Sequence, residues 1–329
     1  MIPHYVLFIH GIGEEKRGFS HGLPDKIREV FTSNITRILS KEPPRDGIAF
    51  REAVWSDITQ NDQNRLWNRL FPYLGSKSLS IWSWLKQPST WIPRAKYWAP
   101  AREFVVHYLG DPIAYVESPG INKYKQITER VLSLINECAQ DASSKGATAQ
   151  KPALLTIVAH SLGSVIASDL FYDVKSKGRS WPSEVRFANF ITMGSPLALY
   201  ILRYGFEKPK AANALPPFLS PIRMDDPDGL WTNIFDPQDP LGYPLKPLNE
   251  AYKQAVFTDK VINAGQWWKV WQWWKQASPL SHMLYWEDET VAEIIGRKAA
   301  LDWLREYEPT LGPHLKQEYT DYKSWVTRG

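Results

Sequence analysis

Short runs of apolar and β-branched residues recur along the chain and predict buried strands. The six runs are Tyr5–Ile9, Ile48–Trp55, Leu154–Ala159, Arg186–Met193, Trp231–Phe235 and Ala255–Ile262. Apolar residues at helical spacing predict helices over Leu23–Leu39, Ile121–Gln140, Leu162–Val174 and Thr290–Tyr307. Strands that alternate with helices are typical of a mostly parallel sheet covered by helices on both faces, with ligands near the carboxyl ends of the strands. We therefore expect a single α/β domain over residues 1–329.

Two segments interrupt this alternation. Residues 57–120 are rich in proline and tryptophan and are too long for a plain connection between elements. Their tryptophans are Trp67, Trp82, Trp84, Trp91 and Trp98. We expect this segment to be a cap insertion over the site, and the proline-rich residues 207–229 to be a second flap.

Composition narrows the class of protein. The chain has 329 residues, of which 43% are hydrophobic and 22% charged, values that exclude a disordered, collagen-like or coiled-coil chain. The net charge of +4 is spread thinly, so a nucleic-acid partner is not expected. No apolar run reaches the roughly 18 residues of a membrane-spanning helix, and the amino end lacks signal-peptide features. With Cys138 as its single cysteine, the chain has no intramolecular disulfide, and we expect a cytoplasmic protein. No sequence feature indicates an oligomeric state.

The clearest chemical signal is the sequence LLTIVAHSLGSVIASD, in which an apolar strand runs directly into a helix of small residues. A nucleophilic serine on a tight strand-to-helix turn needs small residues two positions before and two after it, so that the helix can pass close to the strand. Ala159 and Gly163 meet that requirement around Ser161. We expect Ser161 to be a nucleophile, and the alternative is a helix N-cap.

A serine nucleophile also needs a base and an acid, which follow it along the chain in this type of fold. Two histidines lie downstream of the serine, His282 after the last predicted strand and His314 in a polar C-terminal tail, and we expect His282 to be the base. The strand ending at Phe235 runs into two carboxylates. We expect Asp239 to be the acid, with Asp236 as the fallback because an aspartate before proline often caps a turn.

An oxyanion hole needs backbone N–H donors placed where negative charge develops. One donor is expected from Leu162, the residue after the nucleophile, and the other from the glycine-containing loop after the first strand, at Ile12 or Gly11. That loop lacks the spacings of the phosphate-binding glycine motifs, which argues against a phosphate cradle.

Several blocks of the chain together resemble the DDHD-domain phospholipases, a family of lipase-type α/β-hydrolases. The blocks are VLFIHGIG near the start, YLGDPIAY at 108–115, AHSLGS at 159–164, FITMGSPLALY at 190–200, NIFDPQDPLGYPLKPL from 233 and SHMLYWE at 281–287. The resemblance implies an activity similar to a phospholipase A1 or carboxylesterase, and it places Asp239 at the family's aspartate. It also draws attention to Asp111, which we interpret as a structural turn residue. No metal is predicted.

These features predict a serine hydrolase of acyl esters, with lipid or phospholipid as the expected substrate and no cofactor. Two alternatives remain: a non-catalytic lipid-binding or scaffolding protein on the same fold, and a thioesterase or peptidase with the same triad.

A second group of tryptophans precedes His282. Trp267, Trp271 and Trp274 share one face at helical spacing. We expect this face to pack on the core or the cap as an apolar wall of the acyl-binding cleft, with peripheral docking on a membrane surface as the alternative.

Overall fold

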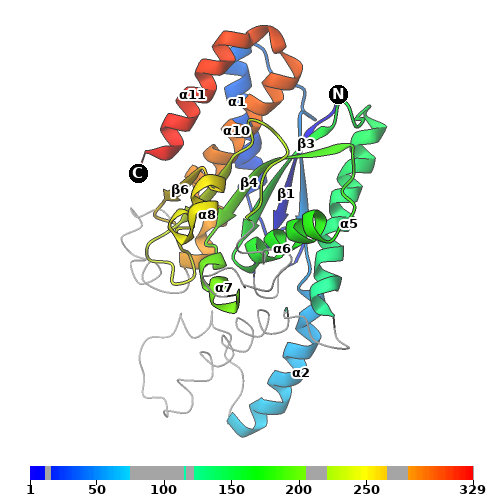
Figure 1. The fold of residues 1–329 in the computed structure, drawn as a ribbon, viewed down its shortest axis with the longest axis vertical. Coiled ribbons are helices and arrows are strands. Elements are labelled where there is room, and N and C mark those ends of the chain that lie inside the picture. Colours follow the sequence, from blue (N-terminus) through cyan, green and yellow to red (C-terminus); the bar gives the residue numbers. More distant parts are fainter. Residues whose placement is uncertain (12–15, 75–114, 116–121, 205–220, 265–280, 329) are drawn as a thin grey trace. The chain divides into compact units, whose positions relative to one another are not determined.

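A six-stranded parallel sheet forms the core of the computed structural model (Figure 1), which describes residues 1–11, 16–74, 115, 122–204, 221–264 and 281–328. The strands are β1 (His4–Ile9), β2 (Ile48–Ala53), β3 (Ala153–His160), β4 (Val185–Met193), β5 (Trp231–Phe235) and β6 (Thr258–Val261). Their order across the sheet is β2-β1-β3-β4-β5-β6, and every neighbouring pair is parallel. The predicted α/β class, a parallel sheet flanked by helices, is confirmed.

Long helices cover both faces of this sheet (Figure 1). On one face lie α1 (Leu23–Leu39), α10 (Glu289–Tyr307) and α11 (Gly312–Thr327), and on the other lies α6 (Leu162–Ser176) with the later part of α5 (Lys123–Ser144). Gly296 lets α10 approach α1 closely, because a Cβ at this position would lie 2.7 Å from the Cβ of Val30. Shorter elements are α7 (Leu197–Tyr204), α8 (Glu250–Ala255), η2 (Lys246–Leu248), η4 (Ser281–Glu287) and η5 (Pro309–Leu311).

The chain divides into two compact units. The first comprises Met1–Gly11, Gly18–Ala53 and Val131–Gly329 and holds all six strands; the second comprises Ile12–Arg17 and Val54–Arg130. The predicted cap falls in the second unit, where the structure describes α2 (Asp57–Leu74) and Tyr115. Most of the cap and most of the predicted flap lie outside the described residues, so both stay predictions.

No described helix has the length and apolar character needed to cross a membrane.

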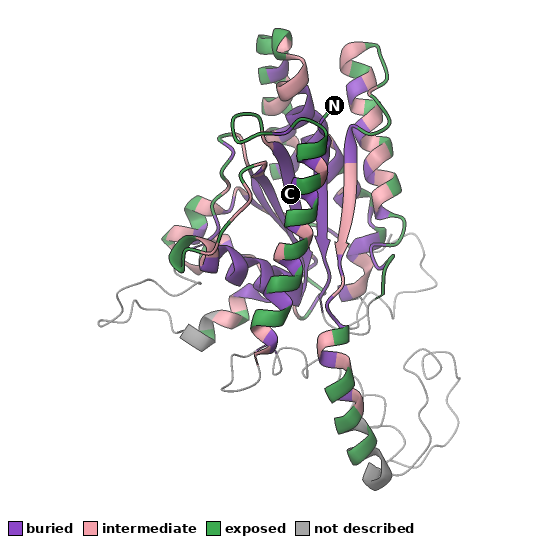
Figure 2. Cartoon of the chain, turned by 90° about the vertical axis from the view of Figure 1, so that its right-hand side faces the viewer, coloured by how far each residue is buried: buried purple, intermediate pink, exposed green. Residues whose placement is uncertain are grey.

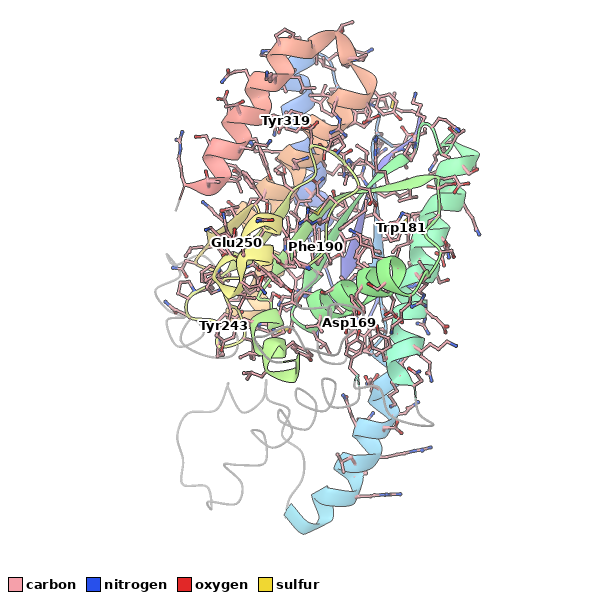
Figure 3. The ribbon with its side chains drawn as sticks, viewed as in Figure 1. Asp169, Trp181, Phe190, Tyr243, Glu250 and Tyr319 are labelled. Atoms are coloured by element: carbon pink, nitrogen blue, oxygen red, sulfur yellow. The ribbon has the colours of Figure 1, made fainter. Side chains whose placement is uncertain are left out.

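The central strands are largely buried on both faces, as expected for a parallel sheet between two helix layers, whereas the edge strands β2 and β6 are only partly buried. Every residue of β1 and β3 is buried (Figure 2). Large rings fill the space between the sheet and the helices: Phe171 of α6 stacks on Phe187 of β4 with ring centroids 4.2 Å apart, and Trp181 packs beside them (Figure 3). The buried tryptophans among the described residues are Trp55, Trp231, Trp286 and Trp303.

Two sequence-based predictions of elements were wrong. The C-terminal segment with His314, predicted as a polar tail, is helix α11. Its buried residues are only Leu315, Tyr322 and Val326, too few for the sequence to show a helical apolar pattern. The last strand was predicted to begin at Ala255, but Ala255 ends α8. Asn249 caps that short helix through its side chain, which accepts a hydrogen bond from the backbone N–H of Tyr252.

Buried polar groups lie among the sheet and the covering helix at the amino ends of β1 and β3. Lys298 pairs with Asp302 at 2.5 Å, and the second oxygen of Asp302 accepts a hydrogen bond from Asn189. Asn189 also donates to the hydroxyl of Thr156, which lies 2.8 Å from Nε2 of His4. Burial, the dominant cause, lowers the pKa of His4 to about 4, so the imidazole is neutral in the folded protein.

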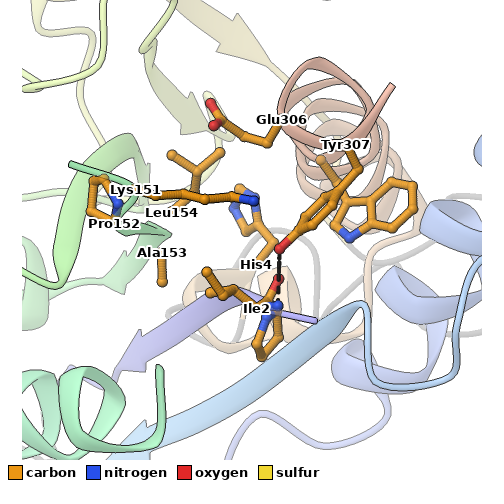
Figure 4. A pocket seen from close by; sticks show the side chains of 10 residues that line it. Ile2, His4, Lys151, Pro152, Ala153, Leu154, Glu306 and Tyr307 are labelled. Atoms are coloured by element: carbon orange, nitrogen blue, oxygen red, sulfur yellow. Dashed lines mark hydrogen bonds between the residues drawn. The ribbon is translucent and has the colours of Figure 1, made fainter. Parts of the chain in front are cut away.

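A small cavity lies beside this cluster (Figure 4). Its volume is about 20 Å³, which is room for roughly one water molecule. It is lined by residues that include Ile2, His4, Lys151, Glu306 and Tyr307. Because it opens at the amino ends of the strands, it is at the opposite end of the sheet from the predicted chemistry.

The buried His4 should make stability sensitive to mild acid. Its pKa is about 4 in the folded chain and about 6.5 when unfolded, so the stability it contributes is fully present above pH 6.5 and is lost as the pH falls toward 4. We expect His4→Gln to reduce the loss of unfolding free energy between about pH 7.5 and about pH 5 by about 2 kcal/mol. Urea titrations at the two pH values measure this. His21→Asn, a change at an exposed histidine with positive φ, is the control and should leave the pH dependence unchanged. An equal pH dependence in wild type and His4→Gln would contradict the interpretation.

Candidate active site

Ser161 lies on a strained turn between β3 and α6. Its backbone has φ 53° and ψ −129°, a conformation that costs a non-glycine residue about 1–3 kcal/mol. Two hydrogen bonds hold the turn: the N–H of Ser161 donates to the carbonyl of Met193 at 2.9 Å, and the hydroxyl of Ser164 donates to the carbonyl of Ser161 at 2.6 Å. The side chain of Ser161 makes no capping bond to α6, so the N-cap alternative does not fit the structure.

The small residues predicted around Ser161 are required by close backbone approach. A Cβ at Gly163 would lie 2.5 Å from the carbonyl oxygen of Ile9, so a larger residue would push α6 away from β1. A Cβ at Gly11 would lie 2.4 Å from the Cβ of Ser161 and 3.0 Å from its Oγ. The end of β1 therefore passes directly against the serine.

This arrangement places both described oxyanion candidates at the serine. Gly11 contacts it as above, and Leu162 is the first residue of α6, where backbone N–H groups have no intrahelical acceptor. The amino end of a helix also favours negative charge. Ile12, the other candidate, lies outside the described residues.

His282 and Asp239 form a buried pair at the carboxyl edge of the sheet. Nδ1 of His282, in η4, lies 2.8 Å from Oδ2 of Asp239, in the loop after β5. Because an ionised carboxylate only accepts hydrogen bonds, Nδ1 carries a proton, and in the neutral form of the ring Nε2 then carries the lone pair. Within the described part of the chain, neither Nε2 of His282 nor Oγ of Ser161 has a hydrogen-bond partner, although both are buried. The structure thus joins the predicted acid to the predicted base and does not hydrogen-bond the base to the serine, a contact that often tightens only when substrate binds.

The environment of Asp239 keeps its carboxyl ionised. Burial by itself raises the pKa of Asp239, but hydrogen bonds from His282, the N–H of Leu241 and the hydroxyl of Tyr285 outweigh burial and leave the pKa below its usual value. An ionised acid is what a histidine base needs, since it orients the ring and stabilises the imidazolium.

Asp236 faces away from the base. Its two carboxylate oxygens accept hydrogen bonds from the backbone N–H groups of Gln238 and Ala264, at 2.8 and 2.9 Å. Burial raises the pKa of Asp236. The structure places Asp239, rather than Asp236, against His282. The side chain of Asp236 instead holds the loop after β5 to Ala264 through these two hydrogen bonds.

Sequence reasoning missed three residues that contact the pair. Nε2–H of His160 donates to the backbone carbonyl of His282 at 2.6 Å, and the two rings lie 4.6 Å apart. Burial lowers the pKa of His160 to about 3, so it is neutral. Tyr285 donates to Asp239, and Gly194, with φ 53°, lies against both members of the pair. The sequence signals were the position of His160 next to Ser161 and the three-residue spacing from His282 to Tyr285.

The other candidates named from the sequence are not among the residues that the structure brings together. Trp267, Trp271, Trp274 and Asp111 fall outside the described residues. His314 is exposed on α11, 3.9 Å from Glu318. No group of three or more histidine, cysteine or acidic side chains able to hold a metal occurs among the residues that the structure describes.

Comparison with known proteins supports a serine hydrolase. Residues 117–203, which include the Ser161 turn, match the family described as "Putative serine esterase (DUF676)". The resemblance to the DDHD family has no match of its own and stays a prediction. No curated protein matches this chain.

Two solved structures are similar over most of the chain. One, described as a "putative hydrolase of the alpha/beta superfamily" from Xanthomonas campestris pv. campestris, is 11% identical with a TM-score of 0.31, covering 98% of both chains. The other, an uncharacterized protein from Pseudomonas aeruginosa, is 12% identical with a TM-score of 0.32, covering 98% of this chain and 50% of its own.

The fit of Gly194 against the pair gives a direct test of the geometry. A Cβ at Gly194 would lie 2.7 Å from Oδ2 of Asp239 and 3.0 Å from Cε1 of His282. We expect Gly194→Ala to separate acid and base and to slow labelling of the protein by a fluorophosphonate at least tenfold.

Gly178→Ala is the matched control. Gly178 also has positive φ, but a Cβ there would meet nothing within 4 Å. This variant should lose about 1 kcal/mol of stability from backbone strain and label at the wild-type rate. Wild-type labelling of Gly194→Ala would show that the Asp239–His282 contact is not needed.

Proposed function

We propose that the protein is a serine hydrolase of carboxylic esters in which Ser161 is the nucleophile, His282 the base and Asp239 the acid. The observation that carries the proposal is the buried Asp239–His282 pair, in which Nδ1 contacts the acid and Nε2 has no hydrogen-bond partner among the described residues, at the same sheet edge as a serine on a strained turn. The register supports a common edge: Ala159 of β3 pairs with Ile9 of β1, and Met193 of β4 pairs with Ile234 of β5.

The chemistry follows from these positions. Ser161 Oγ attacks the ester carbonyl while Nε2 of His282 takes its proton, and the C–O bond to the leaving alcohol breaks as His282 returns that proton to it. Water then attacks the acyl carbonyl while Nε2 of His282 takes a proton from it, and the bond between the acyl group and Ser161 Oγ breaks as His282 returns that proton to Oγ, which releases the carboxylic acid and regenerates the free serine and the neutral base. The backbone N–H of Leu162 and the loop beginning at Gly11 stabilise the oxyanion in both halves. None of these proposed reaction steps requires a cofactor.

We extend the proposal to lipid-like acyl esters. Support comes from the resemblance to DDHD phospholipases and from the sequence of the segment before His282, whose tryptophans are the kind of apolar side chain that an acyl chain would contact. On this proposal the protein is cytoplasmic and contacts a membrane only peripherally, through its substrate. A panel of p-nitrophenyl esters of increasing chain length, lysolipids and phospholipids tests the extension, and a preference for short water-soluble esters would oppose it.

Removal of the nucleophile tests the reaction class. We expect the wild-type protein to be labelled by a fluorophosphonate, and Ser161→Ala to lose labelling and to lower kcat by a factor of about 10⁴ to 10⁶ while its circular dichroism is unchanged. A wild-type protein that does not label and hydrolyses no ester would support a non-catalytic lipid-binding protein.

The two aspartates should behave differently. Asp239→Asn removes the charge that orients His282 and should lower kcat about 10⁴-fold. Asp236→Asn places an amide N–H₂ against the N–H of Gln238 or Ala264, so it should lower stability and leave kcat per folded molecule within a few-fold of wild type. Thermal unfolding together with ester hydrolysis separates these effects. Equal losses of kcat at both positions would contradict the choice of acid.

A further inference from the structure

The hydroxyl of Tyr285 lies between the two aspartates that follow β5. The backbone N–H of Asp236 donates to it at 2.9 Å, and it lies 2.9 Å from Oδ2 of Asp239. Since the N–H can only donate, the single phenolic proton points to Asp239. Burial, followed by the charge of Asp239, raises the pKa of Tyr285 far above its usual value, so this proton stays in place at any working pH.

The carboxylate of Asp239 is fixed on every side. Oδ1 accepts a hydrogen bond from the N–H of Leu241 at 2.9 Å, while Oδ2 is shared between His282 and Tyr285. Positions that a Cβ would take at Gly194 and Gly242 lie 2.7 and 2.8 Å from Oδ2. The carboxylate therefore cannot turn to another partner, and Tyr285 competes with His282 for the same oxygen.

The other titratable groups near His282 do not offset this competition. The ring of His160 in β3 lies 4.6 Å from that of His282 and is tilted by 38° to it, and His10 directly follows β1. Burial keeps both neutral by lowering the pKa of each to about 3. Asp236 in the loop after β5 has both oxygens occupied by backbone N–H groups. Among the described residues, Asp239 is the carboxylate in contact with His282, and Tyr285 acts on that contact.

We infer that Tyr285 is a positioning residue that, by donating to Asp239 Oδ2, fixes the acid and weakens its hold on the His282 imidazolium. This inference rests on the proposed serine hydrolase function. The functional consequence is a base that stays unprotonated, and an enzyme that stays active, at lower pH than the Asp239–His282 contact alone would allow. A donor to the carboxylate reduces the negative charge that favours the protonated base.

Tyr285→Phe removes the hydroxyl and keeps the ring. We expect the acid limb of the pH profile of kcat/KM for p-nitrophenyl acetate to move to higher pH by about 0.5 to 1 unit. Tyr322→Phe is the matched control, because it removes another buried hydroxyl, one that donates to the carbonyl of Ile294 away from the site. Its acid limb should coincide with that of the wild type. An unmoved acid limb in Tyr285→Phe, with or without lower stability, would overturn the inference.

A second variant covers the case in which Tyr285→Phe does not fold, since it leaves the N–H of Asp236 without an acceptor. Tyr285→3-fluorotyrosine keeps the hydroxyl and makes it a stronger donor, so the acid limb should move to lower pH. A shift to higher pH, or none, would count against the inference. Ser161→Ala in the same assay separates the two levels: ester hydrolysis that survives this change refutes the proposed function, whereas Ser161-dependent hydrolysis with an unmoved acid limb refutes only the role of Tyr285.

Discussion

The sharp turn at Ser161 is the constraint on which the rest of the site depends. A residue with φ 53° is held there because β3 must end and α6 must begin within one residue, with α6 passing close to β1. A Cβ at Gly163 would lie 2.5 and 2.6 Å from the carbonyl oxygens of Ile9 and His10, so no larger residue fits there. A chain of hydrogen bonds, in which the direction of each bond is fixed by the next, offsets the strain. The N–H of Leu197 donates to Ser195, the Ser195 hydroxyl donates to that of Ser164, and Ser164 donates to the carbonyl of Ser161. The turn therefore brings the serine hydroxyl and the amino end of α6 to the same point.

Around this turn the protein buries many polar groups but very little charge. His10 and His160 are neutral because burial lowers the pKa of each to about 3, and each still donates a ring N–H to a backbone carbonyl, of Gly11 and of His282. The charge is concentrated on Asp239, whose hydrogen bonds outweigh the cost of burial. Asp239 is therefore the carboxylate that contacts His282, while the side chain of Asp236 is bound by backbone N–H groups.

The amino end of the sheet uses buried charge differently. There Arg305 makes two 2.7 Å bonds to Asp226, and Lys298 pairs with Asp302, so each charge is neutralised locally. These pairs bind α10 to the loop before β5 and to the sheet through Asn189. Each of these four side chains has a partner of opposite charge, which is consistent with a structural role at the end of the sheet away from Ser161.

The sequence by itself determined the elements and the chemistry that depend on neighbours along the chain. Runs rich in apolar and β-branched residues located the strands, although the run predicted for the last strand began inside α8. Small residues at fixed spacing located the turn, and α1 and β5 have the predicted bounds because local propensity and burial agree there. What only the tertiary structure decided are contacts between segments far apart in sequence. The choice between Asp236 and Asp239 depends on which backbone N–H groups saturate each carboxylate, one of them supplied by Ala264. The contacts of Tyr285, His160 and Gly194 form only when η4 packs against the ends of β3 and β4. Helix α11 is held in the fold by three buried side chains in an otherwise polar segment. Sequence patterns record the periodicity of a segment, whereas hydrogen-bond saturation and close approach are set only when distant segments meet.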